Sequence, residues 1–153
     1  MVKKLTFLVL SLILIGFQQL QAQEHSEHGV EYINPRSSFS EVVRVGNMLY
    51  LTGKLGFKDR QLAPGGIKEE TRQTLENIKA VLEKNGSSMD HVVKVTVFLA
   101  DIKEWADMNE VYKTFFPKNR PARSAVGVSG LARDARVEIE CIAVVAQESH
   151  HEN

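Results

Sequence analysis

The chain has 153 residues, and its 19 basic and 19 acidic side chains leave no formal net charge. This balance lacks the basic surplus that nucleic-acid-binding domains usually carry. Cys141 is the only cysteine, so an internal disulfide is excluded. Because Cys141 lies among apolar residues of a predicted strand, its thiol is expected to be a small buried hydrophobe.

The first 22 residues have the layout of a secretory signal peptide. Lys3 and Lys4 are followed by an apolar run over residues 5–17, and the small residue Ala22 ends a polar stretch. A membrane-spanning helix needs about 20 apolar residues, so cleavage after Ala22 is favoured over a retained anchor. We therefore expect an exported protein, periplasmic or secreted, with no stable membrane association.

Polar segments flank the expected domain. Residues 23–36 are predicted to be a flexible N-terminal segment and residues 147–153 a flexible tail, with one domain over residues 37–146 between them. A metal site needs three or four converging ligands. No metal site is therefore predicted from the histidines of these polar segments, which are His25, His28, His150 and His151.

In chain order, the first predicted elements are two strands over residues 39–45 and 48–55. The turn residues Gly46 and Asn47 join these strands into a hairpin. Gly53 lies inside the second strand, where a glycine marks a bulge or a close approach of the backbone to another group.

Two amphipathic helices follow, with a strand between them. Spacings of three and four residues predict a helix over residues 67–85, and residues 92–99 form a strand rich in valine. Asp101 and Glu104 have the spacing of a capping pair for the second helix. The residues expected in the core are Thr71, Leu75, Ile78 and Leu82 of the first helix, and Trp105, Met108, Tyr112 and Phe115 of the second.

Arg123 lies in the next predicted strand. Side chains alternate faces along a strand, so Arg123 shares its face with Ala125 and Gly127, which leave open space beside it. The planar, always charged guanidinium suits a carboxylate. From the residues alone three interpretations stay open for Arg123: it holds a small carboxylate ligand, it is an ordinary solvated residue, or it forms an interface ion pair with Glu138 or Glu140.

The order strand, strand, helix, strand, helix, strand, strand predicts an α+β fold with two helices on one face of a mixed sheet. One side of the last strand, residues 137–144, is apolar, and the other side is mixed and includes two glutamates. Carboxylates are rarely buried unless they are paired. The mixed side is therefore expected to face a wet interface in a homo-oligomer.

From about Asn34 to Val145 the chain resembles the Rid family, the reactive intermediate deaminases, which are also called YjgF-like proteins. The matching landmarks are Gly46-Asn47, Thr52-Gly53, Asn77-Ile78-Lys79 with Leu82, Gly86-Ser87-Ser88, Val93–Leu99, Asn109 with Tyr112 and Phe116, Pro121-Ala122-Arg123-Ser124 and Val137-Glu138-Ile139-Glu140. The resemblance implies a chorismate-mutase-like fold and a homotrimer with sites at the subunit interfaces. It also implies hydrolysis of 2-imino or enamino acids, such as 2-aminoacrylate and 2-iminobutyrate, to 2-keto acids and ammonia, without a cofactor.

The resemblance assigns roles to individual residues. Arg123 corresponds to the arginine that binds the substrate carboxylate, and Glu138 to the glutamate that positions a water molecule. The other matches line the substrate site: Thr52, Gly53, Asn109 and, through its backbone amide, Ala125. From the residues alone, an interface carboxylate stays open for Glu138, and a hydrogen-bonding role within the helix stays open for Asn109.

Two positions depart from the family pattern. Phe39 stands at a substrate-site position where active members commonly have tyrosine, and Lys54 adds a cation after Thr52-Gly53. These departures favour the alternative of an exported trimeric binding protein that holds a small carboxylate without turnover. A third activity, the ribonuclease or translation inhibition of some relatives, is disfavoured by the neutral charge and the export signal.

Overall fold

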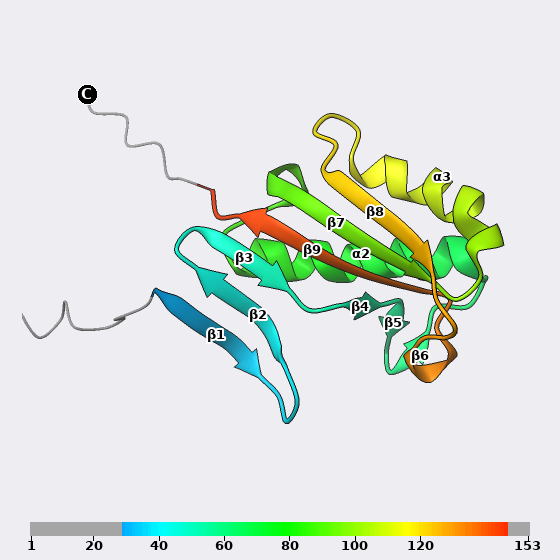
Figure 1. Ribbon diagram of the computed structural model, residues 1–153, viewed down its shortest axis with the longest axis horizontal. Coiled ribbons are helices and arrows are strands. Elements are labelled where there is room, and N and C mark those ends of the chain that lie inside the picture. The colour runs from blue at the N-terminus through cyan, green and yellow to red at the C-terminus, as the bar shows by residue number, and fades with distance from the viewer. Residues whose placement is uncertain (1–28, 147–153) are drawn as a thin grey trace, which may run out of the picture. The chain divides into compact units, whose positions relative to one another are not determined.

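The computed structural model describes residues 29–146 (Figure 1). The expected signal peptide, residues 23–28 and the tail 147–153 lie outside the described residues. Within the described part of the chain, no helix is both long and apolar enough to cross a membrane.

The described chain forms strands, two α-helices and short 3₁₀ turns. The strands are β1 (Val30–Pro35), β2 (Ser40–Val45), β3 (Met48–Leu51), β4 (Lys54–Leu55), β5 (Phe57–Lys58), β6 (Gln61–Leu62), β7 (Val92–Leu99), β8 (Ala122–Gly127) and β9 (Val137–Val144). The helices are α2 (Ile67–Lys84) and α3 (Trp105–Phe115), and the 3₁₀ turns are η1 (Met89–His91), η2 (Ile102–Glu104) and η3 (Ala132–Asp134).

The main sheet has the strand order β1-β2-β3-β9-β7-β8, and β4 also pairs with β9. Strands β7 and β8 are parallel, whereas β9 runs antiparallel to β3, β4 and β7. Parallel neighbours need a crossover connection, and α3 provides it between β7 and β8 (Figure 1). The predicted α+β fold, with two helices on one face of a mixed sheet, is confirmed.

The first strand corrects the expected start of the domain. The sequence predicts a flexible segment over residues 23–36, but Val30–Pro35 form β1 beside β2. The Asn34 side chain donates a hydrogen bond of 2.7 Å to Glu41 Oε2. An edge strand needs few inward apolar residues, and only Ile33 of β1 packs against the core. The segment therefore lacks the repeated inward apolar residues from which a strand is predicted.

The core lies between the sheet and the two helices. The predicted inward face of α2 is confirmed, since Leu75, Ile78 and Leu82 are at most 1% exposed. The predicted face of α3 is only partly right, because Trp105 is 40% exposed while Met108 is fully buried. The exposed ring of Trp105 instead lies near Arg123, as described below.

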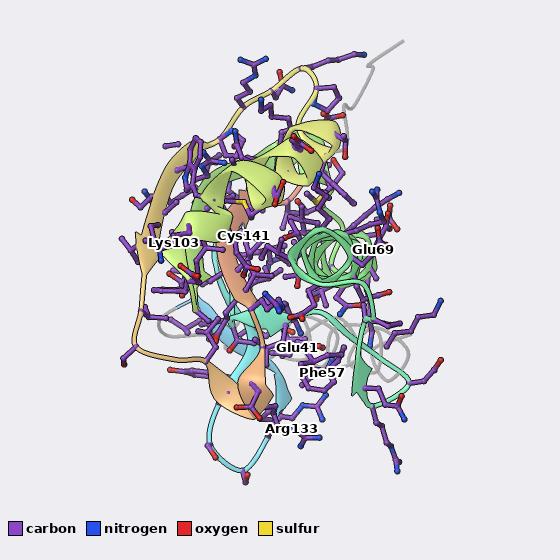
Figure 2. All side chains as sticks on the ribbon, turned by 90° about the vertical axis from the view of Figure 1, so that its right-hand side faces the viewer. Glu41, Phe57, Glu69, Lys103, Arg133 and Cys141 are labelled. Atoms are coloured by element: carbon purple, nitrogen blue, oxygen red, sulfur yellow. The ribbon has the colours of Figure 1, made fainter. Side chains whose placement is uncertain are left out.

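Cys141 of β9 belongs to this core, as predicted. It is 4% exposed, and Figure 2 places it between the strands and helix α3. Burial, with a smaller effect of Glu140, raises the pKa of the thiol to about 12. Because the thiolate is the nucleophilic form, Cys141 is a packing residue rather than a nucleophile.

Asp101 and Glu104 form a cap of a different kind from the predicted pair. The Asp101 carboxylate accepts a 2.9 Å hydrogen bond from the Lys103 backbone N–H, which caps the 3₁₀ turn η2 ahead of α3. Glu104 does not reach back to the turn but pairs with the Arg136 guanidinium. The sequence pattern predicted a single helix start, whereas the structure has the 3₁₀ turn η2 followed directly by α3.

Candidate active site

Arg123 of β8 lies under helix α3. Its Nη1 donates a 2.8 Å hydrogen bond to Asn109 Oδ1. Its Cζ lies 4.4 Å from the ring centre of Tyr112 and 5.6 Å from that of Trp105. Residues three and four apart share one helix face, so Trp105, Asn109 and Tyr112 together hold the guanidinium in place by one hydrogen bond and two aromatic faces.

The alternative partners of Arg123 do not contact it in this chain. Among residues 29–146, Arg123 forms no ion pair with Glu138 or Glu140. The guanidinium is therefore positioned by neutral groups, and its positive charge remains available to an anion.

The open space predicted beside Ala125 and Gly127 is partly filled. A Cβ built on Gly127 would lie 3.0 Å from Cβ of Ile102, so glycine makes room for η2 at this point. The open space instead lies beside α3, in a cavity of about 390 Å³. Its lining residues are Asn109, Tyr112, Lys113, Phe116, Arg120, Pro121 and Arg123.

The backbone of Ala125 faces the unpaired edge of the sheet. Val128 N–H donates a 2.9 Å hydrogen bond to the Leu99 carbonyl on β7. Backbone groups of successive strand residues point to alternate sides, so those of Val126 also face β7. The N–H and C=O of Ala125, one residue earlier, point away from β7 and are open to a ligand or to another chain.

Glu138 of β9 lies against Gly53. A Cβ built on Gly53 would lie only 1.9 Å from Glu138 Oε1, so the carboxylate occupies the space that any larger residue would fill. Tyr50 pairs with Ile142 and Lys54 pairs with Ile139. Between these two pairs the chain around Gly53 advances by four residues while β9 advances by three, so this segment contains one extra residue. The prediction for Gly53 is confirmed, because it lies at both a bulge and a close approach.

The pKa of the Glu138 carboxyl is raised above its ordinary value, first by burial and second by the nearby Glu140. Among the described residues, no hydrogen bond or salt bridge stabilises the Glu138 carboxylate. A raised pKa brings a carboxyl closer to the pH at which it can accept and return protons.

Arg123 and Glu138 lie on opposite faces of the sheet. Arg123 aligns with Val95, and Val95 aligns with the core residue Cys141. Glu138 lies three residues from Cys141, so its side chain points to the other face. Strand spacing and rise place the Cα atoms of Arg123 and Glu138 roughly 14 Å apart.

One chain therefore presents two separate half-sites. The arginine half-site consists of Arg123, Asn109, Tyr112 and the backbone of Ala125, beside α3. The glutamate half-site consists of Glu138, Thr52 and Gly53, on the face without helices. Strand alternation separates Arg123 from Glu138 within one chain, and their joint action at a subunit interface, as the resemblance implies, stays a prediction.

The two positions that depart from the family pattern, Phe39 and Lys54, have different surroundings. Lys54 Nζ forms a 2.6 Å ion pair with Glu41 Oε1, and both side chains are mostly buried. This pairing lowers the pKa of Glu41 and neutralises the extra cation. Phe39 precedes β2 and is 54% exposed.

Sequence reasoning missed Lys113 and Arg120, two cations that line the cavity beside Arg123. Helical spacing could have found Lys113, because it follows Asn109 by one helical turn. Arg120 lies in the irregular segment between α3 and β8, where no periodic pattern indicates the direction of its side chain. Within residues 29–146, no group of three or more histidine, cysteine, aspartate or glutamate side chains is arranged to hold a metal ion.

Comparisons with known proteins agree with this fold. Residues 30–145 match the family model described as Endoribonuclease L-PSP. The chain belongs to this family, the YjgF-like or Rid family. It is 46% identical to a RutC family protein of Pyrococcus horikoshii, over 71% of this chain and 88% of that protein.

A second curated relative carries the name of an activity. The chain is 43% identical to the 2-iminobutanoate/2-iminopropanoate deaminase of Rattus norvegicus, over 70% of this chain and 80% of that enzyme. Among solved structures, E. coli TdcF with bound serine is 32% identical, with a TM-score of 0.68 over 76% of this chain and 98% of that chain. The chain is thus similar in sequence to a named deaminase and in fold to the solved structure of TdcF.

Proposed function

We propose that this Rid family protein hydrolyses 2-imino and enamino acids, of the 2-iminobutyrate and 2-aminoacrylate type, to 2-keto acids and ammonia. The observation that carries the proposal is the arginine half-site. Arg123 is held by Asn109 and Tyr112 with no carboxylate partner among the described residues, and the Ala125 amide beside it faces the open edge. A charged fork next to an unpaired amide suits a small carboxylate.

The reaction needs few groups. Arg123 binds the substrate carboxylate, and the Ala125 backbone orients the rest of the molecule. Glu138 orients a water molecule and accepts its proton as the oxygen bonds to the imine carbon. That proton then passes to nitrogen and gives a carbinolamine. The remaining hydroxyl proton moves to nitrogen as the carbon–nitrogen bond breaks, so that ammonia and a 2-keto acid are released. Holding water and substrate together supplies part of the rate increase.

The full site requires a second copy of the chain, because one chain separates its half-sites. We propose the homotrimer expected of the family, in which the arginine half-site of one subunit meets the glutamate half-site of the next. Tyr50 is 43% and Val126 44% exposed. Both side chains lie on the same helix-free face as Glu138, as their registers show, and burying them would favour such an assembly.

The test uses 2-iminobutyrate generated continuously from 2-aminobutyrate by an amino-acid oxidase, with ammonia-independent detection of 2-oxobutyrate. Arg123→Ala should lower kcat/KM at least about 100-fold, and Glu138→Gln should lower kcat by about 100-fold. Each variant needs an unchanged circular dichroism spectrum to count. Full activity in Arg123→Ala would refute the role of the arginine.

Coexpression tests whether two chains build one site. When both variants are mixed in the same trimers, interfaces with an intact Arg123 on one side and an intact Glu138 on the other should restore about a quarter of wild-type activity. Activity no higher than that of the single variants would show that both residues act within one chain.

The alternative is an exported trimeric binding protein that holds a small carboxylate without turnover. Phe39 supports it, because this residue brings no hydroxyl group. Lys54 no longer supports it, since Glu41 pairs with this cation. Calorimetric binding of 2-oxobutyrate without any acceleration of imine hydrolysis would favour the binding protein.

We also propose that the chain is exported after cleavage behind Ala22. The support is the sequence of residues 1–22, a positive start followed by an apolar run and a small residue. Cell fractionation followed by N-terminal sequencing tests this. A protein in the cytoplasm that retains Met1 would contradict export.

A further inference from the structure

Three cations line the cavity beside α3. Arg123 lies at its sheet side, Lys113 lies one helical turn beyond Asn109 on α3, and Arg120 lies in the segment that leads into β8. Two different parts of the chain therefore direct positive charge toward the same space. Only Arg123 has a role in the function proposed above.

The charge in this cavity is not compensated. Its lining residues include no aspartate or glutamate. Among the described residues, Lys113, Arg120 and Arg123 form no salt bridge, whereas Lys54, Lys68 and Arg136 all do so elsewhere in the chain. A hollow lined by one sign of charge concentrates the field and attracts ligands of the opposite sign.

The cavity is also large for the simplest substrate. Its volume of about 390 Å³ lies within the range of roughly 300–1,000 Å³ that is typical of sites for drug-sized ligands. A four-carbon imino acid has one carboxylate, which Arg123 would bind. Such a substrate would leave Lys113 and Arg120 without an anionic partner.

We propose that the preferred substrates are 2-imino acids with a second carboxylate on the side chain. Arg123 binds the carboxylate next to the imine, and Lys113 and Arg120 bind the distal one. This inference rests on the proposed function and adds the substrate class. The chemistry is the same hydrolysis: water adds to the carbon–nitrogen double bond, ammonia leaves, and the distal carboxylate is unchanged.

The experiment compares two imines made in place by amino-acid oxidases, one from 2-aminobutyrate and one from glutamate. The wild-type protein should show a kcat/KM at least about tenfold higher for the dicarboxylic imine. Arg120→Gln and Lys113→Gln should each lower that ratio by about tenfold, the effect of losing one charged hydrogen bond. Lys79→Gln, an exposed lysine of α2 outside the cavity, is the control and should leave the ratio unchanged.

The outcomes separate this inference from the proposed function. A wild-type protein that hydrolyses 2-iminobutyrate better than the dicarboxylic imine would overturn the substrate class and leave the deaminase intact. If neither imine is hydrolysed, the deaminase fails, and calorimetric titration decides the substrate class. If the wild-type protein binds 2-oxoglutarate more tightly than 2-oxobutyrate, and Arg120→Gln abolishes this difference, the dicarboxylic substrate class is supported. Equal binding of the two keto acids would overturn this substrate class.

Discussion

The two half-sites differ in how much of their geometry one chain provides. Arg123 is positioned by residues of its own chain, because Asn109 binds it and two aromatic rings lie against it. Glu138 is positioned by the absence of a side chain, since it rests over Gly53 and has no hydrogen-bond partner among the described residues. Side-chain contacts therefore define the arginine half-site, whereas the missing side chain of Gly53 makes room for the glutamate half-site.

This difference has a physical reason. A guanidinium keeps its charge in any environment, so neutral groups can fix its direction without affecting its protonation. A carboxyl that must exchange protons loses that ability if strong donors stabilise its ionised form. Few partners and partial burial leave the pKa of Glu138 raised, which suits a proton acceptor.

Of the two half-sites, the glutamate half-site should be the more sensitive to substitution, because the Glu138 carboxylate occupies the space beside Gly53. Gly53→Ala places a Cβ where the carboxylate lies, and the flexible glutamate must move away. We expect kcat to fall by about 100-fold, since small displacements of reacting groups are costly. Stability should fall by less than about 1 kcal/mol, because only a side-chain end is displaced.

Steady-state kinetics with 2-iminobutyrate and urea unfolding measure the two effects of Gly53→Ala. Gly130→Ala is the matched control, because no atom lies within 4 Å of a Cβ built there. If Gly53→Ala keeps full activity, the position of Glu138 over Gly53 has no part in catalysis.

The contacts around Arg123 should be more tolerant. Asn109→Ala removes one hydrogen bond but leaves Tyr112 and Trp105 over the guanidinium, so KM should rise about tenfold while kcat changes less than about threefold. Asn109→Asp should raise KM further, because its carboxylate competes with the substrate for Arg123. A fall in kcat at constant KM would contradict this positioning role.

The smallest effect concerns stability against pH, where Glu138 and Glu41 should behave oppositely. The raised pKa of Glu138 means that ionisation costs folding energy, so stability is lost as pH rises through the folded pKa. Glu138→Gln should therefore stabilise the protein at pH 7 but not at pH 3. The gain should stay below about 1 kcal/mol, since solvent reaches the carboxylate.

For Glu41 the sign is reversed. Its ion pair with Lys54 lowers the pKa of the carboxyl, so its stabilisation is present at neutral pH and lost as pH falls through the folded pKa. Glu41→Gln should destabilise the protein at pH 7 by about 1 kcal/mol or less, and not at pH 3. Urea unfolding of both variants at the two pH values checks the pair, and equal signs would be the contradicting result.

Much of the fold follows from local patterns. The valine-rich run predicted over residues 92–99 is the observed β7, and the inward residues of α2 follow the spacing of three and four. Strand β1 escaped prediction because an edge strand has little to bury. Gly53 was identified as a special position from its residue type alone, but its neighbour Glu138 could not be named.

The sequence by itself determined which residue types are present for the chemistry: an arginine that suits a carboxylate, and a glutamate at the family position. It also showed the alternation that places Glu138 on the mixed side of β9. Only the tertiary structure decided what each side chain meets, because contacts between β8 and α3, or between β9 and the bulge at Gly53, join residues that are far apart in sequence. The separation of Arg123 and Glu138 arises in the same way, from strand order and register together.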